Sequence, residues 1–300
     1  RSVDFCLQPL ALSIVSFCGN FKKERMLLLA LDTSTRQASV ALCDEERLYG
    51  EYTWHVGNNH SVELLERIQR LLAESDLTLS ALAGLAVAIG PGSFNGVRVA
   101  VATAKTLAFA LRKPLVGINT LEVAAAQYQQ WPGPVCALQE AGRSELYAAC
   151  YTFEGQVNAG VLTYRSGQLG DNLLLAPQDL ARYLHEQITP QFGTPGEVQT
   201  SPYLFCGEIS AASRQALLDT MPGEAFFGQT LQSARRASAL ACLARQRIVE
   251  QRLDDPLLLE PLYIRRPSIT TSTRKQPLLG KRVGQTNQSS TEREEGALRH

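Results

Sequence analysis

Residues 28–42 read LLALDTSTRQASVAL, and this stretch decides the fold. An apolar run ends at Asp32, residues 35–37 are typical of a turn, and a second apolar run follows. The pattern predicts two buried strands joined by a tight turn, with Asp32 at the end of the first strand. Asp is a favoured turn residue, so capping of this turn is one interpretation of its position.

The same analysis of apolar periodicity predicts the elements that follow the turn. Apolar periodicity in the first half predicts a third strand at 48–54, a helix at 59–74 with Asn59 as its N-cap, a strand at 84–89, a helix at 97–111, a strand at 115–118 and a helix at 121–129. After the breaker WPGP at 131–134 the order restarts, with strands at 135–138, 145–151 and 161–164, a helix at 177–188, a strand at 203–206, a helix at 210–218, a short strand near Phe226 and a helix at 231–251. Two successive β-β-β-α-β-α blocks predict an α/β protein with a duplicated ribonuclease H-like fold, as in the actin-like ATPases (the ASKHA group).

The order of the predicted elements and the composition of the two ends together predict the domain boundaries. The blocks give an N-terminal actin-like subdomain at 26–130 and a C-terminal one at 131–268. Residues 1–25 precede the first strand and are interpreted as an extraneous extension, whereas residues 269–300 are rich in Ser, Thr, Gln, Lys and Arg and are interpreted as a disordered tail.

Charge and cysteine usage narrow the class of protein. Lys plus Arg (29) equals Asp plus Glu (29), so a broad positive field for capturing nucleic-acid phosphates is not expected. Seven widely spaced cysteines without a C-x-x-C pair predict free thiols in a reducing compartment, and we expect a cytoplasmic protein. The most apolar segment, residues 5–18, is too short to span a membrane and lacks the basic region of a signal peptide.

A glycine-rich loop forms the second notable motif. Residues 90–98 read GPGSFNGVR and lie between a predicted strand and a predicted helix. Glycines allow close backbone approach, Ser93 or Asn95 can cap the helix, and a helix N-terminus after such a loop favours anions. No Gly-Lys-Ser/Thr follows, and the order of residues is not that of a nucleophile elbow. Anion binding and simple packing of the helix on the sheet are both open interpretations.

Three segments carry a family resemblance. GPGSFNGVR is similar to the motif GPGSFTGVR of the TsaB (YeaZ) family, with Asn95 the one departure, and PLYIR at 261–265 is similar to the closing P-x-Y-L-R of that family. The DTST hairpin at 32–35 is the third segment. The resemblance covers about residues 26–275, but Glu140, Gly142 and Ser144 depart from the usual D-A-R-x-G-E pattern, which puts the role of that loop in doubt.

The resemblance implies a non-catalytic subunit. TsaB proteins pair with the catalytic subunit TsaD, work with the ATPase TsaE, and support formation of N6-threonylcarbamoyladenosine (t6A) at A37 of tRNAs that read ANN codons; tRNA is reached through the complex. In TsaD the segment matching residues 113–127 carries two metal-binding histidines four residues apart, and Thr120 and Ala124 stand at those positions here. We therefore expect no catalytic residue, no metal and no cofactor of its own, while ATP or ADP at the partner interface and a homodimer in isolation stay open.

The resemblance also implies two sets of site residues. In the actin-like superfamily the first hairpin faces a phosphate, which gives a candidate phosphate site at Asp32, Thr33, Ser34, Gly90, Gly92, Ser93 and Gly96. The pairing helices give a candidate partner interface at Val62, Leu65, Ile68, Arg98, Ala100, Ala104, Leu107 and Leu111. The same apolar stripes could instead pack on the chain's own sheet.

Other classes of function remain as alternatives. An ATP-binding or ATP-hydrolysing enzyme of the actin-like fold would use Asp32 and the glycine loop. A glycoprotease-like metallopeptidase is less favoured because it needs metal ligands that this sequence lacks. An RNA-binding module would rest on the basic residues Arg265, Arg266, Arg274, Lys275, Lys281 and Arg282, which have no aromatic residues between them.

Overall fold

The first half of the chain forms a mixed five-stranded sheet with the order β3-β2-β1-β4-β5. Our computed structural model describes residues 25–57, 60–158, 160–191, 202–229 and 234–265. The strands of this sheet are β1 (Leu28–Asp32), β2 (Gln37–Cys43), β3 (Leu48–His55), β4 (Gly84–Ala88) and β5 (Leu115–Ile118). β1 pairs antiparallel with β2 and parallel with β4, and every residue of β1 and β4 is buried, as their continuous apolar runs predict.

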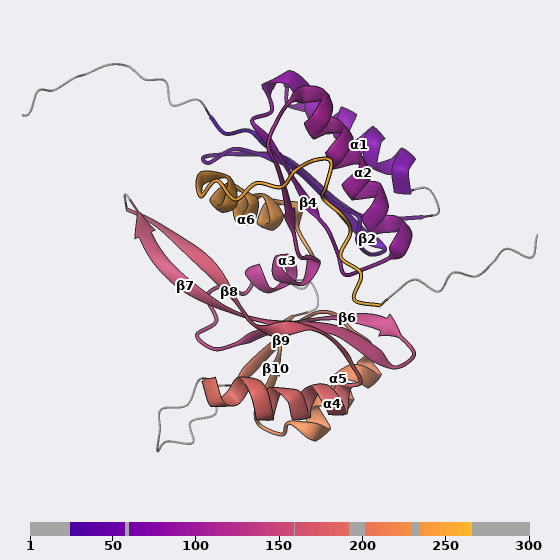
Figure 1. Cartoon of the computed structure of the whole chain (residues 1–300), viewed down its shortest axis with the longest axis vertical. Coiled ribbons are helices and arrows are strands. Elements are labelled where there is room, and N and C mark those ends of the chain that lie inside the picture. Colours follow the sequence, from indigo (N-terminus) through magenta and orange to yellow (C-terminus); the bar gives the residue numbers. More distant parts are fainter. Residues whose placement is uncertain (1–24, 58–59, 159, 192–201, 230–233, 266–300) are drawn as a thin grey trace, which may run out of the picture. The chain divides into compact units, whose positions relative to one another are not determined.

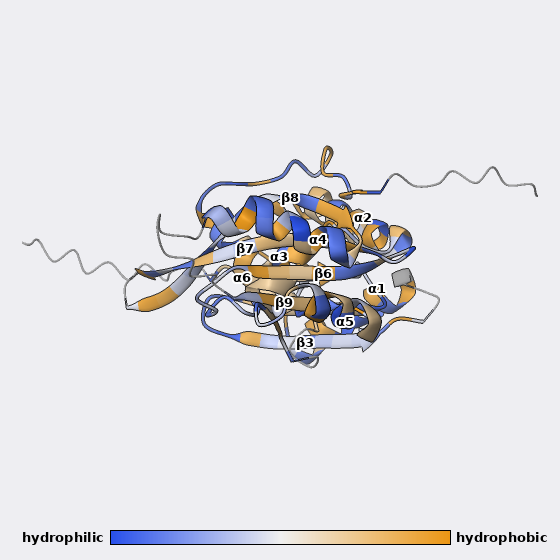
Figure 2. Ribbon diagram, turned by 90° about the horizontal axis from the view of Figure 1, so that it is seen from below, coloured by the Kyte–Doolittle hydropathy of each residue, from blue (hydrophilic) through white to orange (hydrophobic). Residues whose placement is uncertain are grey.

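The second half repeats this plan. Its sheet has the order β10-β9-β6-β7-β8, which is the order of the first sheet when it is read from the other edge. The strands are β6 (Val135–Gly142), β7 (Glu145–Asn158), β8 (Val161–Leu175), β9 (Tyr203–Glu208) and β10 (Ala225–Phe227). Figure 2 shows the inner strand β9 in hydrophobic colours and the edge strand β3 mostly in paler or hydrophilic ones. The predicted duplicated ribonuclease H-like α/β fold is confirmed.

Helices cover both faces of the first sheet. α1 (His60–Glu74) and α2 (Phe94–Leu111) pack on one face, where apolar residues of β1, β2 and β4 meet both helices in one core. α6 (Ala237–Val249) packs on the opposite face, against β1, β2, β4 and β5. α2 begins three residues earlier than predicted because Ser93 is its N-cap and accepts a hydrogen bond from the Gly96 amide at 3.4 Å.

The second sheet is covered in the same way. α4 (Pro177–Tyr183) and α5 (Ala211–Thr220) enclose a core on one face, and α3 (Thr120–Ala126) packs against β6, β7 and β9 on the other. Short helical turns at Leu79–Ala81, Leu184–Ile188 and Thr189–Gln191 complete the elements. Among the described residues, no helix has the length and apolar character needed to cross a bilayer.

The two halves exchange a helix. α3 follows the strands of the first sheet along the chain but packs on the second sheet, whereas α6 follows the second sheet but packs on the first (Figure 1). A chain boundary at residue 130 therefore separates α3 from the sequence with which it forms a core. Each half depends on the other to cover one face of its sheet.

The hairpin of β7 and β8 is much longer than predicted. The expected strand at 161–164 extends to Leu175, and the hairpin projects beyond the rest of the second sheet (Figure 1). β8 is mostly exposed, so its sequence lacks the apolar alternation that reveals a half-buried strand.

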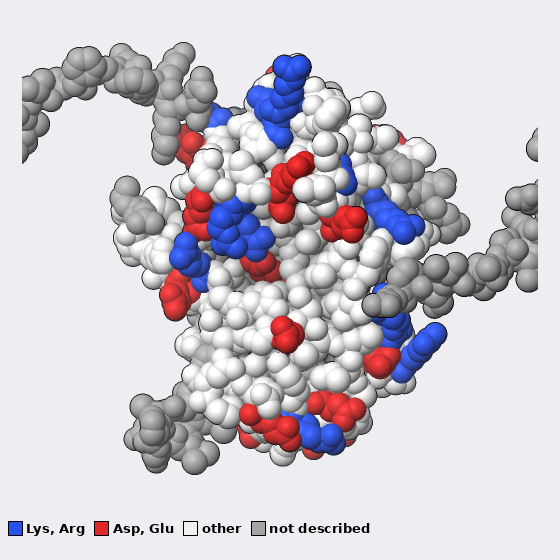
Figure 3. Space-filling view, in the orientation of Figure 1, with Lys and Arg blue, Asp and Glu red and all other residues white. Residues whose placement is uncertain are grey.

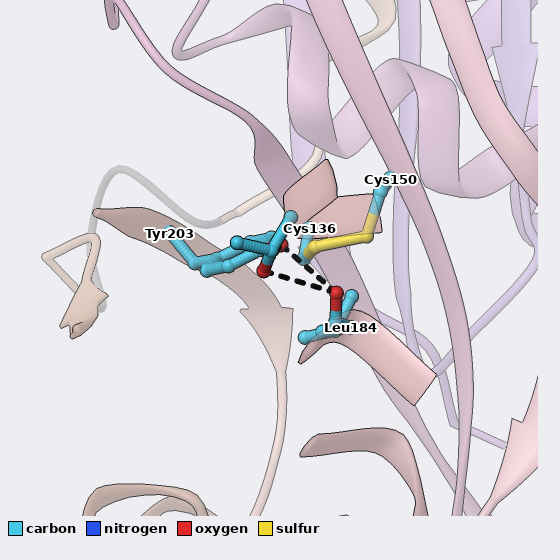
Figure 4. Close-up of a disulfide and its surroundings, with 5 residues drawn as sticks. Cys136, Cys150, Leu184 and Tyr203 are labelled. Atoms are coloured by element: carbon cyan, nitrogen blue, oxygen red, sulfur yellow. Dashed lines mark hydrogen bonds between the residues drawn. A yellow bond between two sulfur atoms is a disulfide. The ribbon is translucent and has the colours of Figure 1, made fainter. Parts of the chain in front are cut away.

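A disulfide joins Cys136 and Cys150, which corrects the prediction of free thiols throughout (Figure 4). The two residues face each other in the register of β6 and β7, an arrangement that sequence spacing alone does not reveal. Cys43, Cys206 and Cys242 are free. Several predictions fall outside the described residues. They concern Cys6, Cys18, the N-cap Asn59, residues 1–24 and the tail at 269–300.

Candidate functional site

The carboxylate of Asp32 is held by the protein's own side chains. Asp32 ends β1 as predicted, and its side chain is only 1% exposed. Oδ1 accepts hydrogen bonds from the Ser34 amide at 2.8 Å and from the Ser34 hydroxyl, and Oδ2 accepts one from Arg235 Nε at 2.9 Å. Both carboxylate oxygens are therefore engaged within the chain.

Arg235 extends this contact to the second half of the chain. Its Nη1 donates to Glu208 Oε1 at 2.6 Å, and Nη2 donates to the Thr35 hydroxyl and to the Gln37 carbonyl oxygen, the latter at 3.2 Å. The guanidinium is 2% exposed, and although burial lowers its pKa, Asp32 and Glu208 raise that pKa above its ordinary value, so it stays charged. We call Asp32, Thr35, Gln37, Glu208 and Arg235 the Arg235 cluster.

The glycine loop is filled by the first hairpin. The Ser93 amide donates to the Ser34 carbonyl oxygen at 2.6 Å, and the Thr33 hydroxyl donates to the Gly96 carbonyl oxygen at 2.6 Å. A Cβ at Gly92 would lie 2.2 Å from the Ser34 oxygen, and one at Gly96 would lie 2.0 Å from the Thr33 oxygen. Most of the predicted phosphate residues thus come together, and they contact one another directly.

The position that resembles the TsaD metal segment has a packing role here. The Thr120 hydroxyl accepts a hydrogen bond from the Gly90 amide at 3.0 Å, and the Thr120 amide donates to the Gly90 carbonyl oxygen at 2.8 Å. Ala124 is buried against the second sheet. Within the described part of the chain, no group of three or more His, Cys, Asp or Glu side chains is placed to hold a metal ion.

The PLYIR segment runs from one half of the molecule to the other. The Leu262 amide donates to the Ile89 carbonyl oxygen at 2.7 Å, and the Tyr263 ring contacts the Phe94 ring in a tilted arrangement with centroids 5.3 Å apart. Arg98 donates to the Tyr263 hydroxyl at 2.9 Å. Arg265 then bonds to the β6–β7 hairpin, at the Ala141 carbonyl oxygen and the Glu145 carboxylate. The end of this segment therefore fixes the N-terminal turn of α2 and contacts the second sheet.

Glu140 departs from the Asp of the family pattern D-A-R-x-G-E, and its contacts give this departure a local explanation. Its carboxylate accepts hydrogen bonds from the Ser210 amide at 2.8 Å and the Ser213 hydroxyl at 2.7 Å, at the N-terminus of α5. Partial burial raises the pKa of Glu140, but these hydrogen bonds outweigh it and lower the pKa below its ordinary value. Glu140 thus supports Ser210, the N-cap residue of α5, which is a structural role.

The apolar residues of the predicted partner interface fall into two groups, and its one charged member, Arg98, is exposed on α2. Val62 and Leu65 on α1 are exposed, at 63% and 49%. The remaining apolar residues pack in the chain's own core, fully for Ile68, Ala100 and Ala104 and partly for Leu107 and Leu111. On α2 the exposed residues include the small side chains of Ala102, Thr106 and Ala110, together with Phe109 at 67%. Because α1 and α2 cover the same sheet face, we call Val62, Leu65, Ala102 and Thr106 the outer helix face.

Arg235 and Glu208 were not singled out in the sequence, whereas Tyr263 belongs to the PLYIR motif that carries part of the resemblance. Arg235 is one of two adjacent arginines before an alanine-rich helix, a pattern that is usual on a solvated surface. Acidic and basic residues are interspersed on the face shown in Figure 3, in line with the balanced composition.

Taken together, the fold and the site define a duplicated ribonuclease H-like protein of the actin-like class in which an internal arginine holds the carboxylate of the first hairpin. Residues 55–272 match the model of a protein family described as "TsaD: tRNA N6-adenosine threonylcarbamoyltransferase". The tRNA threonylcarbamoyladenosine biosynthesis protein TsaB of Bacillus subtilis is 28% identical over 222 residues, which cover 74% of this chain and 88% of that protein.

Further relatives agree with this match. TsaB of Escherichia coli is 33% identical over 128 residues, covering 42% of this chain and 55% of that protein. The solved structure of YeaZ from Pseudomonas aeruginosa superposes with a TM-score of 0.58 at 27% identity, covering 79% of this chain and 99% of that one. The chain belongs to the family that the matching model describes, and within it to the TsaB (YeaZ) proteins.

Proposed function

We propose that this chain is a non-catalytic subunit required for t6A formation at A37 of tRNA, and that it acts by pairing with a TsaD-type catalytic subunit. The relatives named TsaB are described as tRNA threonylcarbamoyladenosine biosynthesis proteins, which supports the pathway. A TsaE-type ATPase and the tRNA would join through the catalytic subunit, since the balanced charge of this chain offers no broad surface for phosphates.

The outer helix face is the observation that carries the pairing proposal. Val62 and Leu65 expose aliphatic side chains beside each other on one side of α1. Ala102 and Thr106 on α2 leave room for the backbone of a neighbouring helix to approach toward the short end of the usual packing distance, about 8 Å, and Phe109, which is 67% exposed one turn further along α2, adds an aromatic side chain to this side. An apolar ridge beside a small-residue surface fits a pair of helices from a partner subunit.

Reconstitution tests the proposal. The full-length chain, a TsaD-type subunit and a TsaE-type ATPase from the same source are combined with tRNA and threonylcarbamoyl-adenylate, and modified A37 is measured with each protein omitted in turn. The variant Val62→Asp/Leu65→Asp places two carboxylates on the outer helix face. Leu107 is not suitable, because it packs against the core and its substitution would affect folding.

A matched control is available at Val249, which is 68% exposed on α6 and lies on the opposite side of the first sheet. We expect Val62→Asp/Leu65→Asp to lose both the complex and the modification, while Val249→Asp keeps both. Modification that proceeds without this chain, or that this chain performs alone, would refute the scaffold role. Full activity of the double variant would leave the subunit role intact but remove the outer helix face as the interface.

A further inference from the structure

Arg235 is a buried cation that pairs with one carboxylate from each half of the chain. It precedes α6 and reaches Asp32 at the end of β1 and Glu208 at the end of β9, so one guanidinium contacts the last residue of a strand in each sheet. The Thr35 hydroxyl also donates to Glu208 Oε1 at 3.1 Å, which closes the ring of contacts between the first hairpin and the second sheet.

The cost of this arrangement points to a dedicated role. Removing a charge from water is expensive, and a buried ion pair offsets that cost only when its geometry is good and its remaining donors are satisfied. Here Nε, Nη1 and Nη2 each have an acceptor within the cluster. Loss of the guanidinium would leave Asp32, which is 1% exposed, without its charge partner.

We propose that Arg235 is a positioning residue that latches the two halves together by occupying, as an internal cation, the space in front of the first-hairpin carboxylate. Its contacts fix the β1–β2 turn relative to the end of β9. The inference does not depend on the proposed function, because it concerns the isolated chain.

The latch has a consequence for nucleotides. Asp32 and Glu208 carry two negative charges against the single positive charge of Arg235, so the cluster as a whole disfavours a polyphosphate. A metal-bound phosphate could reach Asp32 only by displacing Arg235 or Ser34. We therefore expect the Arg235 cluster to exclude Mg-ATP, so that a nucleotide in the complex would bind elsewhere.

Hydrogen exchange on the full-length chain tests the latch. The variant Arg235→Met removes the charge and keeps most of the aliphatic volume. We expect exchange at residues 33–37 and at 205–208 to rise together, by at least about tenfold, because a broken buried pair loosens both sides. Arg236→Met is the matched control: Arg236 is the next residue, its side chain is 60% exposed, and its partner Glu51, which is 7% exposed, keeps a second hydrogen bond from the Ser238 amide. It should leave residues 205–208 unchanged.

A second variant allows the test to be made even if Arg235→Met does not fold. Glu208 is 34% exposed, so Glu208→Gln should fold even if Arg235→Met does not, and it should raise exchange at both segments to a smaller extent. A rise confined to one segment, or no rise in either variant, would overturn the latch. So would protection of residues 32–37 in the unmodified chain by millimolar Mg-ATP, since that result requires the nucleotide to occupy the space assigned to Arg235.

Discussion

Replacing Gly96 by alanine tests whether the glycine loop serves to pack α2 against the first hairpin. In an unconstrained helix, replacing glycine by alanine stabilises the helix by about 1 kcal/mol. Here the new Cβ would lie 2.0 Å from the Thr33 carbonyl oxygen, with backbone on both sides of the clash. We expect an overpacking cost of about 3 kcal/mol and a loss of about 1 kcal/mol from the Thr33 hydrogen bond. The free energy of unfolding should then fall by about 3 kcal/mol, which corresponds to a decrease in Tm of about 6–12 °C by scanning calorimetry.

Gly57 provides the control for this measurement. A Cβ there would meet only the Glu63 carboxylate oxygen at 3.4 Å, at the far end of a flexible side chain. Gly57→Ala should therefore change the free energy of unfolding by no more than about 0.5 kcal/mol. If Gly96→Ala is as stable as the unmodified chain, the packing explanation is wrong and the loop must be kept open for another purpose.

Three further outcomes are expected. Residues 26–130 made alone should fail to unfold cooperatively by calorimetry, and appending residues 237–249 should restore a transition; a sharp transition of the shorter fragment would contradict the helix exchange. Reduction of the Cys136–Cys150 disulfide, which closes a loop of 14 residues, should lower the unfolding free energy by about 3 kcal/mol in denaturant titrations, and Cys136→Ala/Cys150→Ala should be insensitive to reductant. Because the folded-state pKa of Glu140 is lowered, its contribution is present above the unfolded carboxyl pKa of about 4.3 and is lost as pH falls through the folded value; Glu140→Gln should thus be less stable at neutral pH, with a difference that shrinks on acidification.

Sequence patterns predicted the elements that are apolar along their whole length or along one face. β1, β2, β4 and β5 are continuous apolar runs, and α1 has an apolar stripe at helical spacing, so each could be located and the duplicated order followed from them. The second half was predicted less well, because β8 is largely exposed and polar residues reveal no periodicity.

The site was harder to predict for two physical reasons. On α2, alanines occur on every side, so composition could not tell that Ala100 and Ala104 face the core while Ala102 faces solvent. The Arg235 cluster depends on a contact between Asp32 and a residue 203 positions later in the chain. A pairing between residues so distant in sequence has no local signal.

The exchanged helices also bear on how the protein is made. β1 is the first strand and α6 the last helix of the described residues, so during synthesis one face of the first sheet has no cover until residues 237–249 have left the ribosome. Contacts of such long sequence range form late and leave apolar surface open to aggregation in the meantime. The nascent first half is thus a natural substrate for chaperones, and slowing translation after residue 130 should increase its dependence on them.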